Sequence, residues 1–209
     1  MKRIERKEIF KNYDKIRFLV SSIQKVLFDG NYNTEDEKEF DALKLETTHS
    51  KNKEIVLRVE SNDINSYSKK LSEKLKLLLG LMKTKKIIII SSLKIDLFVG
   101  LYNKYHKVKN AYSIFLKYIP EKSYKEAIEL NINEIDDFVE IFFWLTRCVG
   151  NFPEYVWWFD ENQKYCFNLC NNGNIHLTSF LKNNLLNEEN LLKLGFLLDD
   201  EAQFDRLIK

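Results

Sequence analysis

The fold is decided by one stretch, which reads Tyr155-Val-Trp-Trp-Phe159, Asp160-Glu-Asn-Gln163, Lys164-Tyr-Cys-Phe-Asn-Leu-Cys170, Asn171-Asn-Gly-Asn174, Ile175-His-Leu-Thr-Ser-Phe-Leu181. Three runs rich in aromatic and β-branched residues are separated by two polar tetrads. Asn172-Gly173 in the second tetrad supplies the two positive-φ residues of a type I′ turn, which is a strong hairpin signal. The stretch therefore predicts an antiparallel three-stranded meander over residues 155–181.

The two tetrads also predict how the strands pair. If both form the loops, Lys164 lies opposite Phe159 and Ile175 lies opposite Cys170. Because side chains alternate between the faces of a strand, one face then carries Val156, Trp158, Tyr165, Phe167, Leu169, His176, Thr178 and Phe180. The other carries Trp157, Phe159, Cys166, Asn168, Cys170, Ile175 and Leu177. Both are too apolar for water, so either the chain's own helices cover both faces or the second face docks a partner.

The rest of the chain is mainly helical in pattern. Apolar residues recur with helical period over residues 3–28, 64–82, 111–118 and 133–150, and again from Asn187. Residues 122–130 are read as another helix. Strands are predicted at Ile87–Ile90 and in a hairpin formed by residues 43–47 and 54–60. Residues 93–105 are read as a helix, with one long strand through Val99 as the alternative. These elements define an α+β fold with an antiparallel sheet flanked by helices.

Length and composition place the chain among ordinary globular proteins. Its 209 residues fit a single domain, residues 1–209, and its 44% hydrophobic and 31% charged content is typical of one. We expect no membrane partner, because no apolar run approaches the ~20 residues that a membrane helix needs. The charged N-terminal segment does not resemble a signal peptide. Three cysteines fit a reducing compartment, so we expect a cytoplasmic protein.

Charge is divided unevenly along the chain. Residues 1–119 carry 25 Lys and Arg against 15 Asp and Glu, a net charge of +10, whereas residues 120–209 carry 8 against 16, a net charge of −8. The two parts, read as a basic and an acidic subdomain that share one core, either neutralise each other or leave a charged surface for a partner.

The sequence predicts no cofactor and no metal site. Cys166 and Cys170, four residues apart on one strand, lie about 13 Å apart, too far to share one zinc ion. In the pairing above His176 falls on the face opposite Cys170. A Cys–His nucleophile pair is open to any of the cysteines, but no spacing supports one, and buried apolar cysteines are the simpler reading. The carboxylates around the second hairpin are read as solvated surface rather than a nuclease centre; they are Asp41, Glu46, Glu54 and Glu60.

One group of basic residues favours nucleic-acid binding. The group is Lys69, Lys70, Lys74, Lys76, Lys83, Lys85 and Lys86. Such a stripe binds phosphates through charge alone. It lacks the arginine, asparagine and glutamine that read bases, and it lacks interleaved aromatic residues. A solvated helix face is therefore the competing interpretation.

The acidic part favours a protein partner. Carboxylates surround the aromatic residues of the meander, and the candidate surface is Glu134, Asp137, Glu154, Tyr155, Trp157, Phe159, Asp160 and Glu161. Acidic groups steer a basic partner and aromatic residues anchor it. In composition and architecture this arrangement resembles immunity proteins that neutralise basic toxin nucleases. It implies a non-catalytic, antitoxin-type inhibitor that captures another, basic protein. An enzyme without a known motif is the third hypothesis, which a cleft with converging ionisable side chains would reveal.

Overall fold

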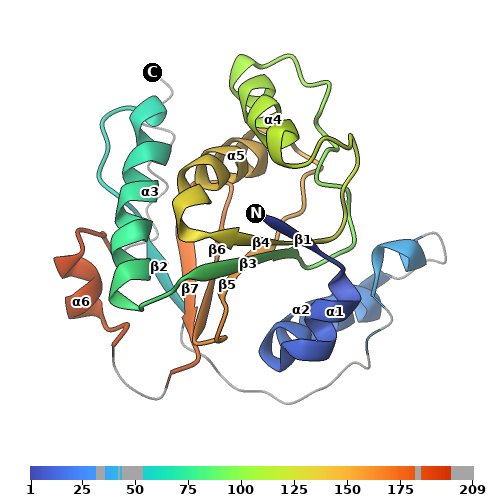
Figure 1. The fold of residues 1–209 in the computed structure, drawn as a ribbon, viewed down its shortest axis with the longest axis horizontal. Helices are drawn as coiled ribbons and strands as arrows, with labels where there is room; N and C mark the ends of the chain where they lie inside the picture. The colour runs from blue at the N-terminus through green and yellow to red at the C-terminus, as the bar shows by residue number, and fades with distance from the viewer. Residues whose placement is uncertain (32–35, 42, 44–53, 182–184, 199–209) are drawn as a thin grey trace.

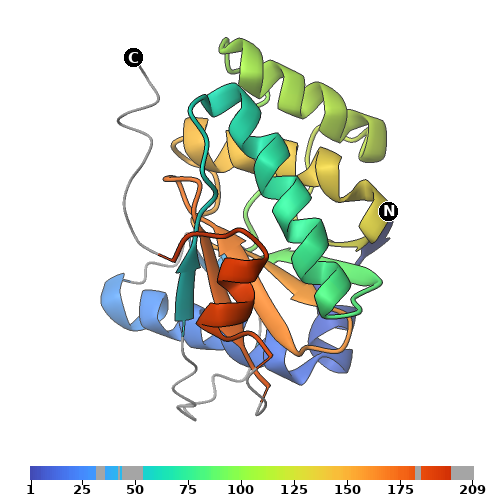
Figure 2. The same cartoon turned by 90° about the vertical axis from the view of Figure 1, so that its left-hand side faces the viewer.

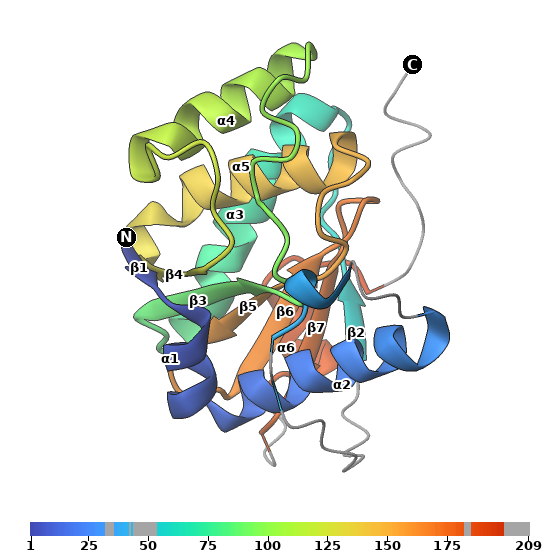
Figure 3. The same cartoon turned by 90° about the vertical axis from the view of Figure 1, so that its right-hand side faces the viewer.

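The computed structural model describes residues 1–31, 36–41, 43, 54–181 and 185–198. It has three layers, with one antiparallel sheet between two layers of helices (Figure 1). Helices α3, α4 and α5 lie on one face, and α1 and α2 lie on the other, as the view in Figure 3 shows. The α+β class predicted from the sequence is confirmed.

The sheet has seven strands in the order β1-β4-β3-β5-β6-β7-β2, and every neighbouring pair is antiparallel. The strands are β1 (Lys2–Ile4), β2 (Glu54–Leu57), β3 (Lys86–Ser91), β4 (Ala127–Asn131), β5 (Val156–Asp160), β6 (Tyr165–Leu169) and β7 (Ile175–Ser179). The predicted meander is β5-β6-β7. The predicted strand at Ile87–Ile90 is β3, whose apolar run is buried on both faces of the sheet.

The larger core lies between the sheet and α3 (Ile64–Leu81), α4 (His106–Tyr118) and α5 (Ile135–Cys148). Helix α5 rests directly on the sheet, where Phe142 meets Trp158 with ring centroids 5.5 Å apart. Helix α4 packs on α5 on the side away from the sheet (Figure 3). The short helix α6 (Glu188–Lys193) lies beside α3, as Figure 2 shows, and buries Leu191 in the same core.

The second face of the sheet is covered by α1 (Arg6–Asn12) and α2 (Asp14–Asn31). Ile9, Ile16 and Val20 from these helices pack against Trp157 and Phe159, which are 5% and 0% exposed. Of the two alternatives for this face, cover by the chain's own helices is the one observed.

The turn between β6 and β7 differs from the prediction. Gly173 has φ +79°, but Asn172 does not have a positive φ, so the turn is not type I′. Gly173 N donates to Cys170 O at 2.9 Å and Cys170 N donates to Asn174 O at 3.0 Å. Asn171, Asn172 and Gly173 thus form a three-residue loop with the glycine in the left-handed region.

This shorter loop shifts the register of β7 by one residue. Leu169 pairs with Ile175, and Asn168 pairs with His176. Because a one-residue shift moves every side chain to the other face, the prediction for β7 was wrong. Ile175 and Leu177 join the core under α5, and His176 lies on the face that also carries Asn168 and Cys170. The first loop also differs, with Phe159 opposite Cys166, but that shift of two residues leaves the faces of β6 unchanged.

The remaining predictions had mixed outcomes. Helices α3 and α5 agree closely with the expected ranges, and Asp63 caps α3 by accepting from Ser66 N at 2.9 Å. The single helix over residues 3–28 is wrong, because the non-helical backbone of Tyr13 (φ −130°, ψ 88°) separates α1 from α2 and residues 2–4 form β1. Residues 92–105 form turns rather than a helix or a strand, and residues 127–131 form β4 instead of a helix.

Two further expectations concern the ends of the described ranges. The first arm of the predicted second hairpin lies largely outside the described residues, whereas its second arm includes β2, which pairs with β7. The last helix ends at Lys193, and Gly195 has φ +83°. Among the described residues, no helix is long and apolar enough to cross a membrane.

Gly173→Ala tests the turn. A Cβ is unfavourable at a positive φ, so we expect a loss of about 1 kcal/mol and a melting temperature lower by about 2–4 °C. Gly173→Asn should cost less, because asparagine tolerates this conformation better. Gly80→Ala is the control, since a Cβ at Gly80 meets no heavy atom within 4 Å. Equal melting temperatures for Gly173→Ala and Gly80→Ala would contradict this account of the turn.

Candidate functional site

The corrected register brings a cysteine, a histidine and a glutamate together. His176 on β7 and Cys170, which follows β6, line one cavity and shift each other's pKa, and His176 Nδ1 lies 3.0 Å from Oε1 of Glu54 on β2. Because β7 lies between β6 and β2 in the sheet, the two partners approach the imidazole from opposite sides. The order thiol, imidazole, carboxylate is that of a nucleophile, a base and the group that orients the base.

The surroundings favour the charged forms of the thiol and the imidazole. Burial opposes ionisation of Cys170, but hydrogen bonds from His176 and from the backbone of Asn172 and Asn174 outweigh it and lower the thiol pKa. The hydrogen bond to Cys170 raises the pKa of His176 to about 9, and although burial acts against this, Glu54 adds to the rise. Both shifts favour a thiolate beside an imidazolium, which is the reactive form of a cysteine.

A cavity of about 590 Å³ opens onto this pair. Its lining comes partly from β6, β7 and β2 through Asn168, Cys170, His176 and Glu54, and partly from the end of α5 and the segment that follows it. That segment contributes Val149, Gly150, Phe152, Pro153, Glu154 and Tyr155. Arg147 Nη1 donates to Asn171 O at 3.2 Å and so ties the end of α5 to the hairpin loop. The volume is in the range of small-molecule sites.

The same three residue types also serve as metal ligands elsewhere, but their arrangement here is different. His176 stands between its two partners instead of converging with them on one point. Among the residues that the structure describes, no group of three or more His, Cys, Asp or Glu is placed to hold a metal ion.

The predicted acidic and aromatic surface is not brought together as one open patch. Trp157 and Phe159 are buried under α1 and α2, so these two members cannot contact a partner in this conformation. Asp160 is also buried; it accepts hydrogen bonds from the backbone of Asn162 and Tyr165 and holds the first hairpin loop. Only Glu154 and Tyr155 of the eight candidates line the cavity.

The other acidic candidates have internal partners. Glu134 pairs with the N-terminal amine of Met1, Asp137 accepts from the Tyr118 hydroxyl at 2.6 Å, and Glu161 accepts from the backbone N–H of Lys85 at 3.1 Å. These contacts tie the acidic part of the sequence to the basic part. Of these three contacts only that of Glu134 pairs opposite charges, since the Tyr118 hydroxyl and the Lys85 N–H are neutral, and binding of a basic protein stays a prediction.

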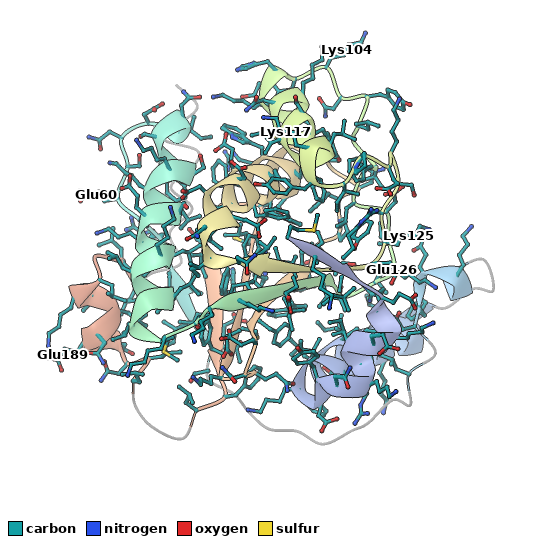
Figure 4. All side chains as sticks on the ribbon, in the orientation of Figure 1. Glu60, Lys104, Lys117, Lys125, Glu126 and Glu189 are labelled. Atoms are coloured by element: carbon teal, nitrogen blue, oxygen red, sulfur yellow. The ribbon has the colours of Figure 1, made fainter. Side chains whose placement is uncertain are left out.

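The predicted lysine stripe is divided between two sides of α3. Lys76 pairs with Asp136 of α5, and Lys69 lies in the same hollow between α3 and α5. Lys70 Nζ donates to Glu60 O at 3.2 Å, and Lys74 approaches Gly195 beyond α6. Lys83 and Lys85 are exposed near the turn after α3, and Lys86 pairs with Glu129 of β4 at 2.9 Å. Lys76 and Lys86 are thus paired with carboxylates, and Figure 4 shows Glu60 and Glu189 on the same side of the molecule as α3.

Sequence reasoning missed the site for two reasons. The predicted loop length placed His176 on the wrong face, and Glu54 was assigned to solvated surface. Glycine at position 173 is compatible with both loop lengths, so only the observed pairing distinguishes them. Comparison of this chain with protein-family models, with curated proteins and with solved structures gives no match.

Replacing His176 tests the charged pair. In His176→Gln, burial of Cys170 is no longer opposed by the imidazolium, so the thiol pKa should rise. At a pH below the thiol pKa, each unit by which that pKa rises lowers the thiolate fraction about tenfold. We expect the alkylation rate of Cys170 at pH 7 to fall by about tenfold or more, measured in a Cys148→Ser background by mass spectrometry.

The control for this experiment is His106→Gln, which changes an exposed histidine on α4. It should leave both the rate and its pH dependence unchanged. A wild-type Cys170 that reacts with the pH dependence of an ordinary thiol, with no effect of His176→Gln, would show that the pair is not ionised.

Proposed function

We propose that this protein is an enzyme that transfers or hydrolyses acyl groups through a covalent thioester on Cys170. The observation that carries the proposal is that Cys170, His176 and Glu54 line one cavity, where His176 Nδ1 lies 3.0 Å from Glu54 Oε1 and His176 lowers the pKa of the Cys170 thiol. In this assignment Cys170 is the nucleophile and His176 is the acid and base. Glu54 is a positioning residue, which orients the imidazole and stabilises its protonated form.

The first half of the reaction forms the thioester. The Cys170 thiolate bonds to the carbonyl carbon of the substrate and pushes the π electrons onto the carbonyl oxygen. When the tetrahedral intermediate collapses, the bond to the leaving group breaks and the leaving group takes the proton of the His176 imidazolium. An acyl group then remains on Sγ, and His176 is neutral.

The second half releases the acyl group. Neutral His176 takes a proton from water, and the resulting hydroxide bonds to the thioester carbon. Collapse of this intermediate expels the Cys170 thiolate and yields a carboxylic acid, with the imidazolium restored. A different nucleophile in place of water would give acyl transfer instead.

The pH dependence follows from the two titrating groups. The resting pair needs a deprotonated Cys170, whose pKa is lowered, and a protonated His176, whose pKa is about 9. The rate of thioester formation should therefore increase with pH as the Cys170 thiol ionises, at a pH below that at which an ordinary thiol ionises. The rate should fall again as the pH passes about 9, because His176 then lacks the proton for the leaving group.

Acylation by p-nitrophenyl acetate tests the proposal without knowledge of the natural substrate. We expect a burst of p-nitrophenolate, an acetyl group located on Cys170 by peptide mass spectrometry, and continued turnover. Cys170→Ala should abolish the acetylated peptide and the burst. Glu54→Gln should slow both by about tenfold, the effect of losing roughly 1.4 kcal/mol of stabilisation.

Cys148→Ser is the matched control, since it removes another thiol that is partly accessible. It should retain the burst and the turnover. The proposal would be overturned by acetylation that spares Cys170, or by a burst that persists unchanged in Cys170→Ala.

The hypotheses of a basic protein partner and of nucleic-acid binding concern other surfaces of the molecule. They remain predictions that the geometry of the cavity does not address, and a cytoplasmic location remains a prediction as well. Glu154 and Tyr155 belong to both the predicted partner surface and the cavity, so a protein partner that used them would cover the mouth of the cavity.

A further inference from the structure

Asn168 is a cavity residue whose side chain has no hydrogen-bond partner among the described residues. It lies on β6, is 4% exposed and lines the cavity beside Cys170. An amide that lines a cavity and makes no hydrogen bond within the protein is completed by water or by a ligand. Asn168 therefore points to the chemistry of the group that the cavity receives.

An asparagine amide presents one acceptor and one donor side by side. Its Oδ1 accepts and its Nδ2 donates. Water entering from the cavity satisfies both atoms in the free protein, and a ligand that displaces this water must replace both bonds or lose affinity. Esters, thioesters and carboxylates offer acceptors only, so they leave Oδ1 unpaired. A carboxamide offers an acceptor and a donor and satisfies both atoms.

The kind of carboxamide can be narrowed further. In a trans secondary amide, which includes the ordinary peptide bond, the N–H and the C=O point in opposite directions. A single asparagine side chain cannot bond both of them. A primary carboxamide has one N–H on the same side as its C=O, so it pairs with both atoms of Asn168 at once.

Asn168 is also in the right place relative to the nucleophile. It precedes Cys170 by two residues on the same face, about 7 Å away along the strand, and its cross-strand neighbour is His176. An amide paired in its own plane with Asn168 keeps the face of its carbonyl carbon open to a thiolate. Val149, Phe152 and Pro153 also line the cavity and offer apolar surface to the rest of the substrate.

We infer that the substrate group is a primary carboxamide, which Asn168 selects, and that the acyl transfer releases ammonia. This inference rests on the proposed function. Cys170 forms the thioester as the C–N bond breaks, and the departing nitrogen takes the His176 proton to leave as ammonia. Water then releases the carboxylic acid. Asn168 is a specificity-determining residue in this scheme.

The test compares three neutral alkylating reagents that differ in the group Asn168 would bind. They are 2-bromoacetamide, N-methyl-2-bromoacetamide and methyl bromoacetate. The alkylation rate of Cys170 is measured with each reagent in a Cys148→Ser background. Each rate is then divided by the rate at which the same reagent alkylates free cysteine thiolate. We expect the normalised rate for the primary amide to exceed the other two by about tenfold, the effect of one or two hydrogen bonds to a buried partner.

Variants of the two cavity asparagines separate specificity from folding. Asn168→Leu keeps the size of the side chain and should reduce the preference to about one, and Asn168→Asp should do the same because it loses the donor. Asn171→Leu, which changes another asparagine at the cavity, should keep the preference. The melting temperature and the dependence of the alkylation on His176 confirm that each variant retains the fold and the thiolate.

The outcomes distinguish the two proposals. An unreactive Cys170, indifferent to His176, overturns the proposed function and this inference with it. A reactive Cys170 that alkylates with all three reagents at equal normalised rates, or whose preference survives in Asn168→Leu, overturns the inference alone.

Discussion

The site depends on a hairpin that turns in three residues. With Gly173 in the left-handed region (φ +79°), the loop closes over Asn171, Asn172 and Gly173, and Leu169 pairs with Ile175. One more residue in the loop would rotate His176 into the apolar core under α5 and bring Leu177 to the cavity side. A single backbone conformation thus decides both which side chains of β7 fill the core and whether His176 meets Cys170.

The sequence predicted the elements that depend on residues close together in the chain, and it failed where residues far apart in the chain decide the structure. Helices α3 and α5 and strand β3 follow from local periodicity, and all three were predicted. The break at Tyr13 and the turns over 92–105 were missed, because apolar side chains with helical spacing also occur in segments that tertiary contacts hold in other conformations. The pairing of Glu54 with His176 joins residues 122 positions apart at the edge of the sheet, and no local pattern encodes it.

The charge asymmetry is also explained by contacts across the chain. Asp136 pairs with Lys76, Glu129 pairs with Lys86 and Glu134 pairs with the N-terminal amine. In each case a carboxylate from the acidic part meets a cation from the basic part. The opposed charges thus serve to join α5 and β4 to α3, β3 and the N-terminus, and the net charges of the two parts are a weak guide to a partner.

The character of the sheet face beneath α1 and α2 changes along its length. Ile88, Ile90, Trp157, Phe159 and Cys166 make it apolar near the centre, and the packing there needs no polar group. At the end of β6 the same face carries Asn168, Cys170 and His176. A thiol in such a place costs stability when it ionises, because burial opposes the charged form of Cys170. Apolar residues at these positions would make the fold at least as stable. A departure from the packing rule that also places a thiol, an imidazole and an amide around one cavity is the kind expected of a functional site.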